Sequence, residues 1–194
     1  YKVITTKPLP VAGFDINQVN QCVKENTYSF TDSSKYVGTK LQNIWQLGDS
    51  VNVYNSDKIS KVFATDSTYT IKLISISKDL CSDTVTQQIT VKPSVKADFT
   101  IKDSLCLKGN TFFTTQLSSI KSPQTISKYE WDFNDNTSAS FAQPQKTYTD
   151  TGLYTVRLIA FADNGCHDTT EKQIRVLPSP KATYTTANVC DRDT

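Results

Sequence analysis

Tyr154-Thr-Val-Arg-Leu-Ile-Ala160 is a stretch that places Tyr154, Val156, Leu158 and Ala160 on one face. Apolar residues at every second position are typical of a β-strand with one face buried. The stretch Tyr69-Thr-Ile-Lys-Leu-Ile-Ser75 has the same pattern about 85 residues earlier. No segment shows a convincing helical period, so the sequence predicts an all-β fold.

The same order of residues recurs along the whole chain at this period. The stretch Pro8-Leu-Pro-Val-Ala-Gly-Phe14 returns as Pro93-Ser-Val-Lys-Ala-Asp-Phe99 and again as Pro178-Ser-Pro-Lys-Ala-Thr-Tyr184. A cysteine follows each copy at a similar distance, and further aromatic and cysteine residues are matched in order. The matches are Cys22, Cys106 and Cys190; Trp45 and Trp131; Phe63 and Tyr148; Tyr69 and Tyr154; Cys81 and Cys166. Self-similarity at a fixed period indicates a repeat architecture.

We therefore expect two complete repeats, residues 8–92 and 93–177. Residues 1–7 resemble the last strand of a preceding repeat, and residues 178–194 begin a further one. A repeat with about seven short strands, a Trp on the third and a Tyr on the penultimate strand is typical of an immunoglobulin-like β-sandwich. The core residues predicted from these matches are Trp45, Trp131, Tyr69 and Tyr154.

Composition excludes several classes of protein. The net charge of +2 is spread along the chain, and the lack of a dense Lys/Arg cluster argues against nucleic-acid binding. No apolar run approaches the ~18 residues of a membrane span. The chain lacks Met even at position 1, which is expected of an excised or processed segment.

Catalysis is not expected from this sequence. His167 is the only histidine, and the chain has only six glycines. None of the nucleophile, zinc-protease or phosphate-binding motifs is present. We predict that the chain is not an enzyme.

The second repeat carries three motifs in order. They are Trp131-Asp-Phe-Asn-Asp-Asn136, Lys146-Thr-Tyr-Thr-Asp-Thr-Gly-Leu-Tyr-Thr-Val156 and Asp163-Asn-Gly-Cys166. This set resembles the polycystic kidney disease (PKD) domain family, with Asn134 and Asn136 where that family usually has Gly. Asn tolerates the left-handed backbone that such a turn requires. The first repeat, with Trp45-Gln-Leu-Gly-Asp-Ser50, resembles the family more weakly.

The resemblance implies a display function outside the cell. Arrays of PKD-type repeats with added cysteines resemble large bacterial surface proteins such as gliding-motility adhesins. The implied role is a stalk or filament on the cell surface whose partners are neighbouring repeats, with surface glycans or proteins bound through other regions. Two alternatives are a carbohydrate- or protein-binding accessory module of a secreted hydrolase and a component of a matrix or sheath.

Five cysteines without a C-x-x-C pair point to disulfides and hence to an exported protein. Strands of a seven-strand sandwich alternate in direction, which places Cys22 in the first loop at one pole and Cys81 in the last hairpin at the other. A disulfide tolerates only ~4.4–6.8 Å between Cα atoms, so a pair within one repeat is disfavoured. We expect Cys22 to bond Cys166 of the next repeat.

The remaining cysteines would then have partners in neighbouring repeats. These are Cys81, Cys106 and Cys190. The alternative is pairing within each repeat, Cys22 with Cys81 and Cys106 with Cys166, if the first strand is short and the chain doubles back.

One oxygen-rich turn has two interpretations. It contains Asp132, Asn134, Asp135 and Asn136. Calcium takes six to eight oxygen ligands, but the EF-hand spacing is absent, so calcium is the weaker interpretation. Capping of the turn by Asx side chains is the stronger one, and we expect no cofactor.

Overall fold

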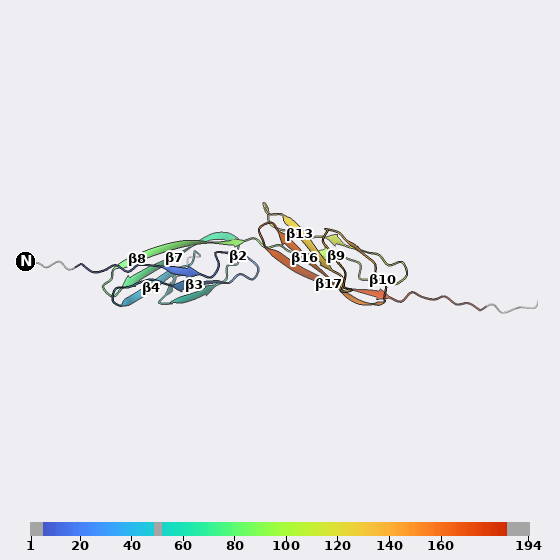
Figure 1. Cartoon of the computed structure of the whole chain (residues 1–194), viewed down its shortest axis with the longest axis horizontal. Coiled ribbons are helices and arrows are strands. Elements are labelled where there is room, and N and C mark those ends of the chain that lie inside the picture. The colour runs from blue at the N-terminus through green and yellow to red at the C-terminus, as the bar shows by residue number, and fades with distance from the viewer. Residues whose placement is uncertain (1–5, 49–51, 186–194) are drawn as a thin grey trace, which may run out of the picture. The chain divides into compact units, whose positions relative to one another are not determined.

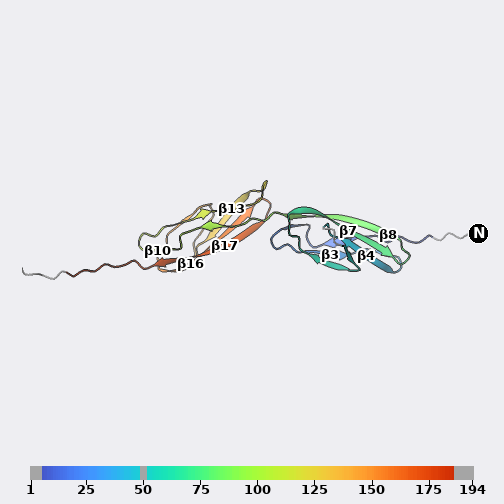
Figure 2. The ribbon, with the colours of Figure 1, turned by 180° about the vertical axis from the view of Figure 1, so that it is seen from behind.

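The computed structural model describes residues 6–48 and 52–185, and every regular element in these ranges is a β-strand. The chain forms two compact units. The first comprises the chain up to Val95 with Ile120–Thr125 and Ala162–Cys166. The second comprises Lys96–Ser119, Ile126–Phe161 and the chain from His167 onward. Figures 1 and 2 show the strands of each unit from opposite sides.

The strands of the first unit form two sheets, with the orders β1-β3-β6 and β2-β8-β7-β4-β5. Neighbouring strands are antiparallel except β2 and β8, which are parallel. The bounds are β1 (Phe14–Ile16), β2 (Asn20–Cys22), β3 (Tyr28–Asp32), β4 (Lys40–Gln46), β5 (Asn52–Tyr54), β6 (Lys58–Lys61), β7 (Ser67–Ser77) and β8 (Ser82–Lys92).

The strands of the second unit repeat this plan, with a five-stranded sheet of order β10-β17-β16-β13-β14. The shorter strands form the pairs β11-β15 and β12-β9. The bounds are β9 (Phe99–Thr100), β10 (Ser104–Cys106), β11 (Phe112–Phe113), β12 (Thr115–Gln116), β13 (Ile126–Asp132), β14 (Ser138–Ala139), β15 (Gln145–Lys146), β16 (Gly152–Ala162) and β17 (His167–Leu177).

The long hairpins follow the predicted alternation. Val156, Leu158 and Ala160 of β16 are buried, as are Ile71 and Leu73 of β7. Each of these strands pairs antiparallel with the next, β7 with β8 and β16 with β17. The all-β sandwich fold predicted from the sequence is therefore confirmed.

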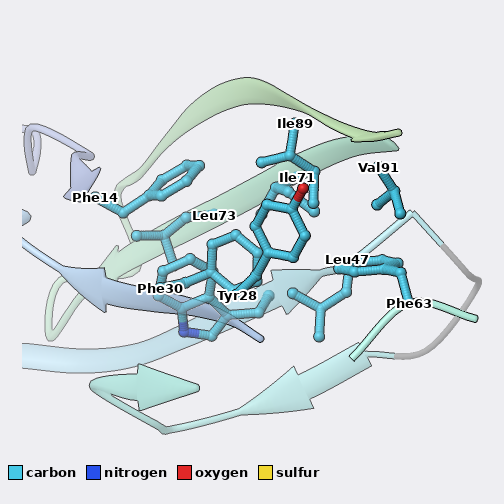
Figure 3. Packing of buried hydrophobic residues seen from close by; sticks show 10 residues of the cluster. Phe14, Tyr28, Phe30, Leu47, Phe63, Ile71, Leu73, Ile89 and Val91 are labelled. Atoms are coloured by element: carbon cyan, nitrogen blue, oxygen red, sulfur yellow. The ribbon is translucent and has the colours of Figure 1, made fainter. Parts of the chain in front are cut away.

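The first core contains the buried Trp45, and Figure 3 labels the other buried members of this cluster. Trp45 is fully buried, Phe14 meets it edge-on at 5.2 Å between ring centroids, and its indole N–H donates to the Ser56 carbonyl at 2.8 Å. Partnering the N–H removes the penalty of burying a polar group. The other buried members are Tyr28, Phe30, Leu47, Phe63, Ile71, Leu73, Ile89 and Val91.

The second core is built in the same way around Trp131. Phe99 meets Trp131 edge-on at 4.9 Å between centroids, and the Trp131 indole N–H donates to the Phe141 carbonyl at 3.0 Å. The other buried members are Phe112, Phe133, Tyr148, Val156, Leu158, Ile174 and Val176.

Tyr69 and Tyr154 lie at the edge of these cores, half-buried, and not at their centres. The Tyr69 hydroxyl donates to the Thr65 carbonyl at 3.0 Å, and the Tyr154 hydroxyl donates to the Asp150 carbonyl at 3.1 Å. This is the geometry of a tyrosine corner, in which the ring packs inward while the hydroxyl closes the preceding turn. Each ring therefore packs against its core while its hydroxyl is bonded to the turn at the edge.

A buried asparagine braces the same loop in both units. Asn26 donates to the carbonyls of Val23 and Phe63 and accepts from the Phe63 N–H, at 2.7, 2.8 and 2.8 Å. Asn110 makes the equivalent three bonds with Leu107 and Tyr148, at 2.7, 2.9 and 2.8 Å. Neither asparagine was among the core residues predicted from the sequence.

Two expected end elements fall largely outside the described residues. The strand expected at 1–7 includes residues 1–5, which lie outside them, and residues 6–7 are not in a strand. The expected start of a further repeat, 178–194, is described only to residue 185, and that part contains no strand. Cys190 also lies outside the described residues.

Candidate functional site: the disulfide-bonded turn

Cys22 ends a short strand and not a loop, which corrects the sequence-based placement. After β1 the chain crosses to the other sheet, where β2 runs parallel to the end of β8 and pairs Cys22 with Lys92. The Val23 N–H then donates to the Lys92 carbonyl at 2.8 Å. Cys22 is thereby held beside the C-terminal end of the last strand of its sheet. Cys106, at the end of β10, is placed likewise beside Leu177.

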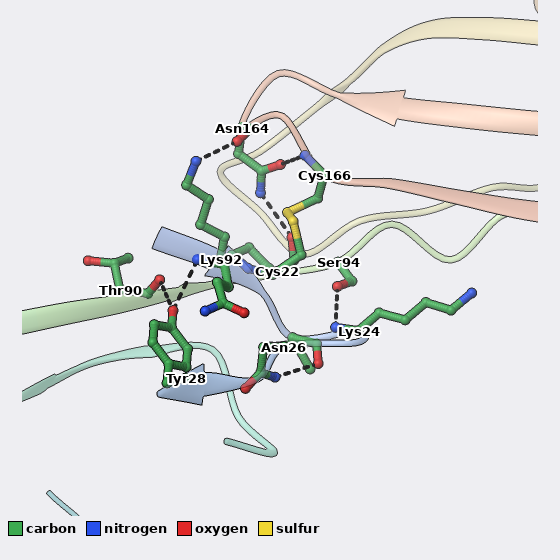
Figure 4. The surroundings of a disulfide bond; sticks show 12 residues. Cys22, Lys24, Asn26, Tyr28, Thr90, Lys92, Ser94, Asn164 and Cys166 are labelled. Atoms are coloured by element: carbon green, nitrogen blue, oxygen red, sulfur yellow. Dashed lines mark hydrogen bonds between the residues drawn. A yellow bond between two sulfur atoms is a disulfide. The ribbon is translucent and has the colours of Figure 1, made fainter. Parts of the chain in front are cut away.

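Cys22 forms a disulfide with Cys166, across 144 residues of sequence (Figure 4). The Cα atoms lie 5.8 Å apart, inside the usual range, and Cys166 is fully buried. This is the pair that the sequence analysis favours. The alternatives within one repeat are not formed, because Cys81 and Cys106 are free. The turn Ala162–Cys166 belongs to the first unit, although β16 and β17 continue from it in the second.

The backbone of this turn positions Cys166. Gly165 has φ +87°, a left-handed conformation that suits glycine. The Asn164 side-chain oxygen accepts from the Cys166 N–H at 2.9 Å, and the Ala162 N–H donates to the Cys166 carbonyl at 2.8 Å. Both backbone groups of Cys166 are therefore bonded, which fixes the backbone of this residue.

Polar contacts surround the disulfide (Figure 4). Lys92 Nζ donates to the Asn164 carbonyl at 2.9 Å, and Asn164 Nδ2 donates to the Pro93 carbonyl at 2.9 Å. The Lys24 N–H donates to Ser94 Oγ at 2.8 Å. Asn164 therefore bonds both Cys166 and the segment that follows β8. The sequence showed Asn164 only as a turn former, and Lys92 carried no signal beyond its place at the end of a strand.

A second loop, Ile120–Thr125, groups with the same unit. Lys121 Nζ lies 2.7 Å from Asp66 Oδ2, and this hydrogen bond lowers the pKa of the Asp66 carboxyl below its usual value. Asp163 Oδ2 accepts from the Thr125 N–H and hydroxyl at 3.0 and 2.8 Å. The disulfide-bonded turn is thus connected to this loop as well.

The carboxylates of the oxygen-rich turn are bonded to other groups of the protein. Asn134 and Asn136 have φ of 60° and 63°, the left-handed conformation predicted for them. Asp132 Oδ1 caps the Asn134 N–H at 2.9 Å, and its other oxygen lies 3.1 Å from Arg157. The first of these contacts is Asx capping, and the second is an ion pair.

The second carboxylate of this turn, that of Asp135, is also engaged. Desolvation would raise its pKa, but hydrogen bonds from Lys146 and Thr137 outweigh this, and the pKa is lowered. Within residues 6–48 and 52–185, no group of three or more His, Cys, Asp or Glu side chains is arranged to hold a metal ion.

The tryptophans are core residues, and His167 is exposed next to the ring of Phe161 at 5.5 Å. No helix able to cross a membrane occurs in the part of the chain that the structure describes.

Two units of paired β-sheets around a buried Trp, each with a tyrosine corner, define immunoglobulin-like β-sandwich modules. Residues 96–176 match the family model of the PKD domain. The chain belongs to the PKD domain family through this stretch.

Solved PKD domains are similar to this chain. The PKD1 domain from the Vibrio cholerae metalloprotease PrtV is 31% identical, covering 43% of this chain and 98% of its own, with a TM-score of 0.39. The PKD1 domain of Vibrio anguillarum Epp is 27% identical, covering 44% and 96%, with a TM-score of 0.39. The fibronectin(III)-like modules of Clostridium thermocellum CbhA are 14% identical, covering 90% and 100%, with a TM-score of 0.43. A search of curated proteins gives no match.

The PKD family and this fold are generally those of non-catalytic modules, and they fit an accessory or adhesive module. A disulfide of this kind is typical of proteins in an oxidising compartment outside the cytosol.

Proposed function

We propose that this chain is a structural segment of a large extracellular protein of the bacterial cell surface, acting as a stalk or filament that projects or links binding regions. The observation that carries the proposal is the Cys22–Cys166 disulfide. It bonds a residue of the stretch 8–92 to a residue of the matched stretch 93–177. A covalent link between successive repeats of a tandem array limits the motion that interfaces between domains otherwise permit.

The same disulfide determines the path of tension through the chain. When the two ends of the chain are pulled apart, the shortest covalent path between them runs from Cys22 through the disulfide to Cys166. The backbone between them, across a separation of 144 residues, cannot be extended while the bond is intact. Both buried tryptophans lie in that segment. A chain built in this way is limited in how far it can extend under load, because only the parts outside Cys22 and Cys166 can lengthen, and this limit suits a stalk.

The described surface also favours a structural role over a binding module. A glycan-binding face presents a contiguous row of exposed apolar or aromatic side chains. Among the described residues, the exposed large aromatic side chains occur on separate elements and not along one strand: Tyr54, Phe113, Phe141 and Tyr184. The proposal therefore assigns surface glycans or proteins to other regions of the protein, and it assigns no cofactor to this segment.

Single-molecule stretching of the chain tests this role. With the disulfide intact, the segment between Cys22 and Cys166 is expected to stay folded or at least unextended under load. Reduction, or Cys166→Ser, is expected to release roughly 490 Å more contour length, from ~3.4 Å for each of the 144 residues.

The matched control is the double variant Cys81→Ser/Cys106→Ser, which keeps the disulfide and should stretch like the oxidised parent chain. Equal extension of the oxidised chain and Cys166→Ser would contradict the proposal. Specific binding of this chain to a glycan array would support the accessory-module alternative instead.

A further inference from the structure

Cys81 and Cys106 are free, and each lies in surroundings that repeat one half of the Cys22–Cys166 site. We propose that Cys106 and Cys81 each supply one half of a further disulfide of the same kind, formed head-to-tail with other repeats of this type. Cys106 bonds the cysteine that corresponds to Cys166 in a following repeat. Cys81 bonds the cysteine that corresponds to Cys22 in a preceding repeat. The inference rests on the proposed function, because it extends the link between repeats along an array.

The strand pairing and hydrogen bonds around Cys106 are the same as those around Cys22. Both cysteines end a short strand that runs parallel to the last strand of a sheet, and both are followed by the same two hydrogen bonds. At Cys22 the bonds are Val23 N–H to Lys92 O and Lys24 N–H to Ser94 Oγ, both 2.8 Å. At Cys106 they are Leu107 N–H to Leu177 O and Lys108 N–H to Ser179 Oγ, 2.7 and 2.8 Å.

The turn at Cys81 reproduces the turn at Cys166. The Ser77 N–H donates to the Cys81 carbonyl at 2.9 Å, as Ala162 does to Cys166 at 2.8 Å. The residue before each cysteine has a left-handed backbone, with φ +61° at Leu80 and +87° at Gly165. A left-handed leucine is uncommon, so the turn keeps this shape in spite of its sequence.

An ion pair beside Cys81 supplies an independent observation. Lys7 Nζ lies 3.3 Å from Asp79 Oδ1. Lys7 precedes Pro8 as Lys92 precedes Pro93, and Asp79 lies two residues before Cys81 as Asn164 lies two before Cys166. The contact of Lys92 with the Asn164 backbone carbonyl that accompanies the existing disulfide therefore has a counterpart at Cys81, where Lys7 contacts the Asp79 side chain instead. Lys7 thus corresponds to Lys92. By this equivalence, the partner of Cys81 is the cysteine of a preceding repeat that corresponds to Cys22.

Both thiols are accessible to an oxidant, since Cys106 is exposed and Cys81 is partly exposed. The bond forms when a thiolate of one repeat attacks a mixed disulfide on the other. Overall, two thiols lose two protons and two electrons to a small disulfide such as oxidised glutathione, which is released as two thiols.

A mixing experiment with two variants of the whole chain tests the pairing. Both variants carry Cys190→Ser, so that only Cys81 and Cys106 differ. One has Cys81→Ser and keeps Cys106, and the other has Cys106→Ser and keeps Cys81. Each is incubated in a glutathione redox buffer alone and in an equimolar mixture, and products are examined on non-reducing gels and by peptide mass spectrometry.

The expected result is a covalent heterodimer in the mixture, joined through Cys106 and Cys81, in at least tenfold excess over homodimers in either variant alone. Homodimers in amounts equal to the heterodimer, or the absence of any covalent dimer, would overturn the inference. The state of Cys22–Cys166 in the same digests separates the two proposals. If that bond is intact and no heterodimer forms, only the inference fails, whereas its absence removes the basis of the proposed function.

Discussion

Trp131→Ala is expected to lower the free energy of unfolding of the second unit by about 3–5 kcal/mol, the range for truncating a large buried aromatic residue. Trp131 is 1% exposed and lies between Phe99, edge-on at 4.9 Å, and Phe133, stacked at 6.4 Å. The substitution removes these contacts and leaves the Phe141 carbonyl without its indole donor at 3.0 Å. A cavity and a lost hydrogen bond act in the same direction.

Urea unfolding of the oxidised chain measures this effect. Circular dichroism follows both units, and the remaining Trp45 fluorescence reports on the first unit alone. The matched control is Phe141→Ala, because Phe141 is 60% exposed and its backbone carbonyl is retained. The control is expected to change stability by no more than about 0.5 kcal/mol. A loss below ~1 kcal/mol for Trp131→Ala would show that this residue is not the centre of the core.

Asn26→Ala is expected to destabilise the first unit by about 2–4 kcal/mol. Asn26 is 2% exposed and makes three hydrogen bonds to the backbone of Val23 and Phe63. Its truncation leaves buried backbone groups without partners, and each such group costs ~1–3 kcal/mol unless water replaces the side chain. The effect is therefore larger than the loss of the side-chain volume alone.

The same denaturation experiment checks this result, with Asn52→Ala as control, because Asn52 lies exposed on β5. A control within about 0.5 kcal/mol of the parent chain is expected. Asn110→Ala should reproduce the Asn26 effect in the second unit, since its three bonds are equivalent. If Asn26→Ala and Asn52→Ala lowered the free energy of unfolding equally, the buried Asn26 amide would not have the stabilising role assigned to it.

Much of the fold could be predicted because the determining signals are local. The alternation in 69–75 and 154–160 corresponds to β7 and β16, and the matched tryptophans are the buried centres. The left-handed backbone at Asn134 could be predicted because residue type limits φ there. Gly48, at the matched position, has φ +79°, so the first unit uses glycine for the same backbone conformation.

Other features could not be predicted, because they depend on tertiary register. Strands of two or three residues, such as β1 and β2, are too short to show a period, so the crossing from one sheet to the other was missed. The contacts of Lys92 and Asn164 join residues 72 positions apart, and no local pattern reports them. The family model extends only over residues 96–176, and the first unit was recognised through its internal similarity to that stretch.

The disulfide pairing could be predicted in part from the sequence. It depends on tertiary structure, yet strand direction and the limit on Cα distance favour pairing between repeats over pairing within one repeat. The alternation of strand direction disfavoured pairs within one repeat, and Cys22 is bonded to Cys166. The rule that strands of a sandwich alternate in direction, so that its loops lie at two opposite poles, was sufficient to predict the pair. The placement of Cys22 in a loop was nevertheless wrong.

The measurement that tests the central claim most directly is a map of the disulfides in native material, by mass spectrometry of peptides from a non-reducing digest. We predict that the peptides containing Cys22 and Cys166 are linked to each other and separate on reduction. Linked peptides containing Cys22 with Cys81, or Cys106 with Cys166, would contradict it, because each repeat would then be closed on itself and no covalent bond would join one to the next.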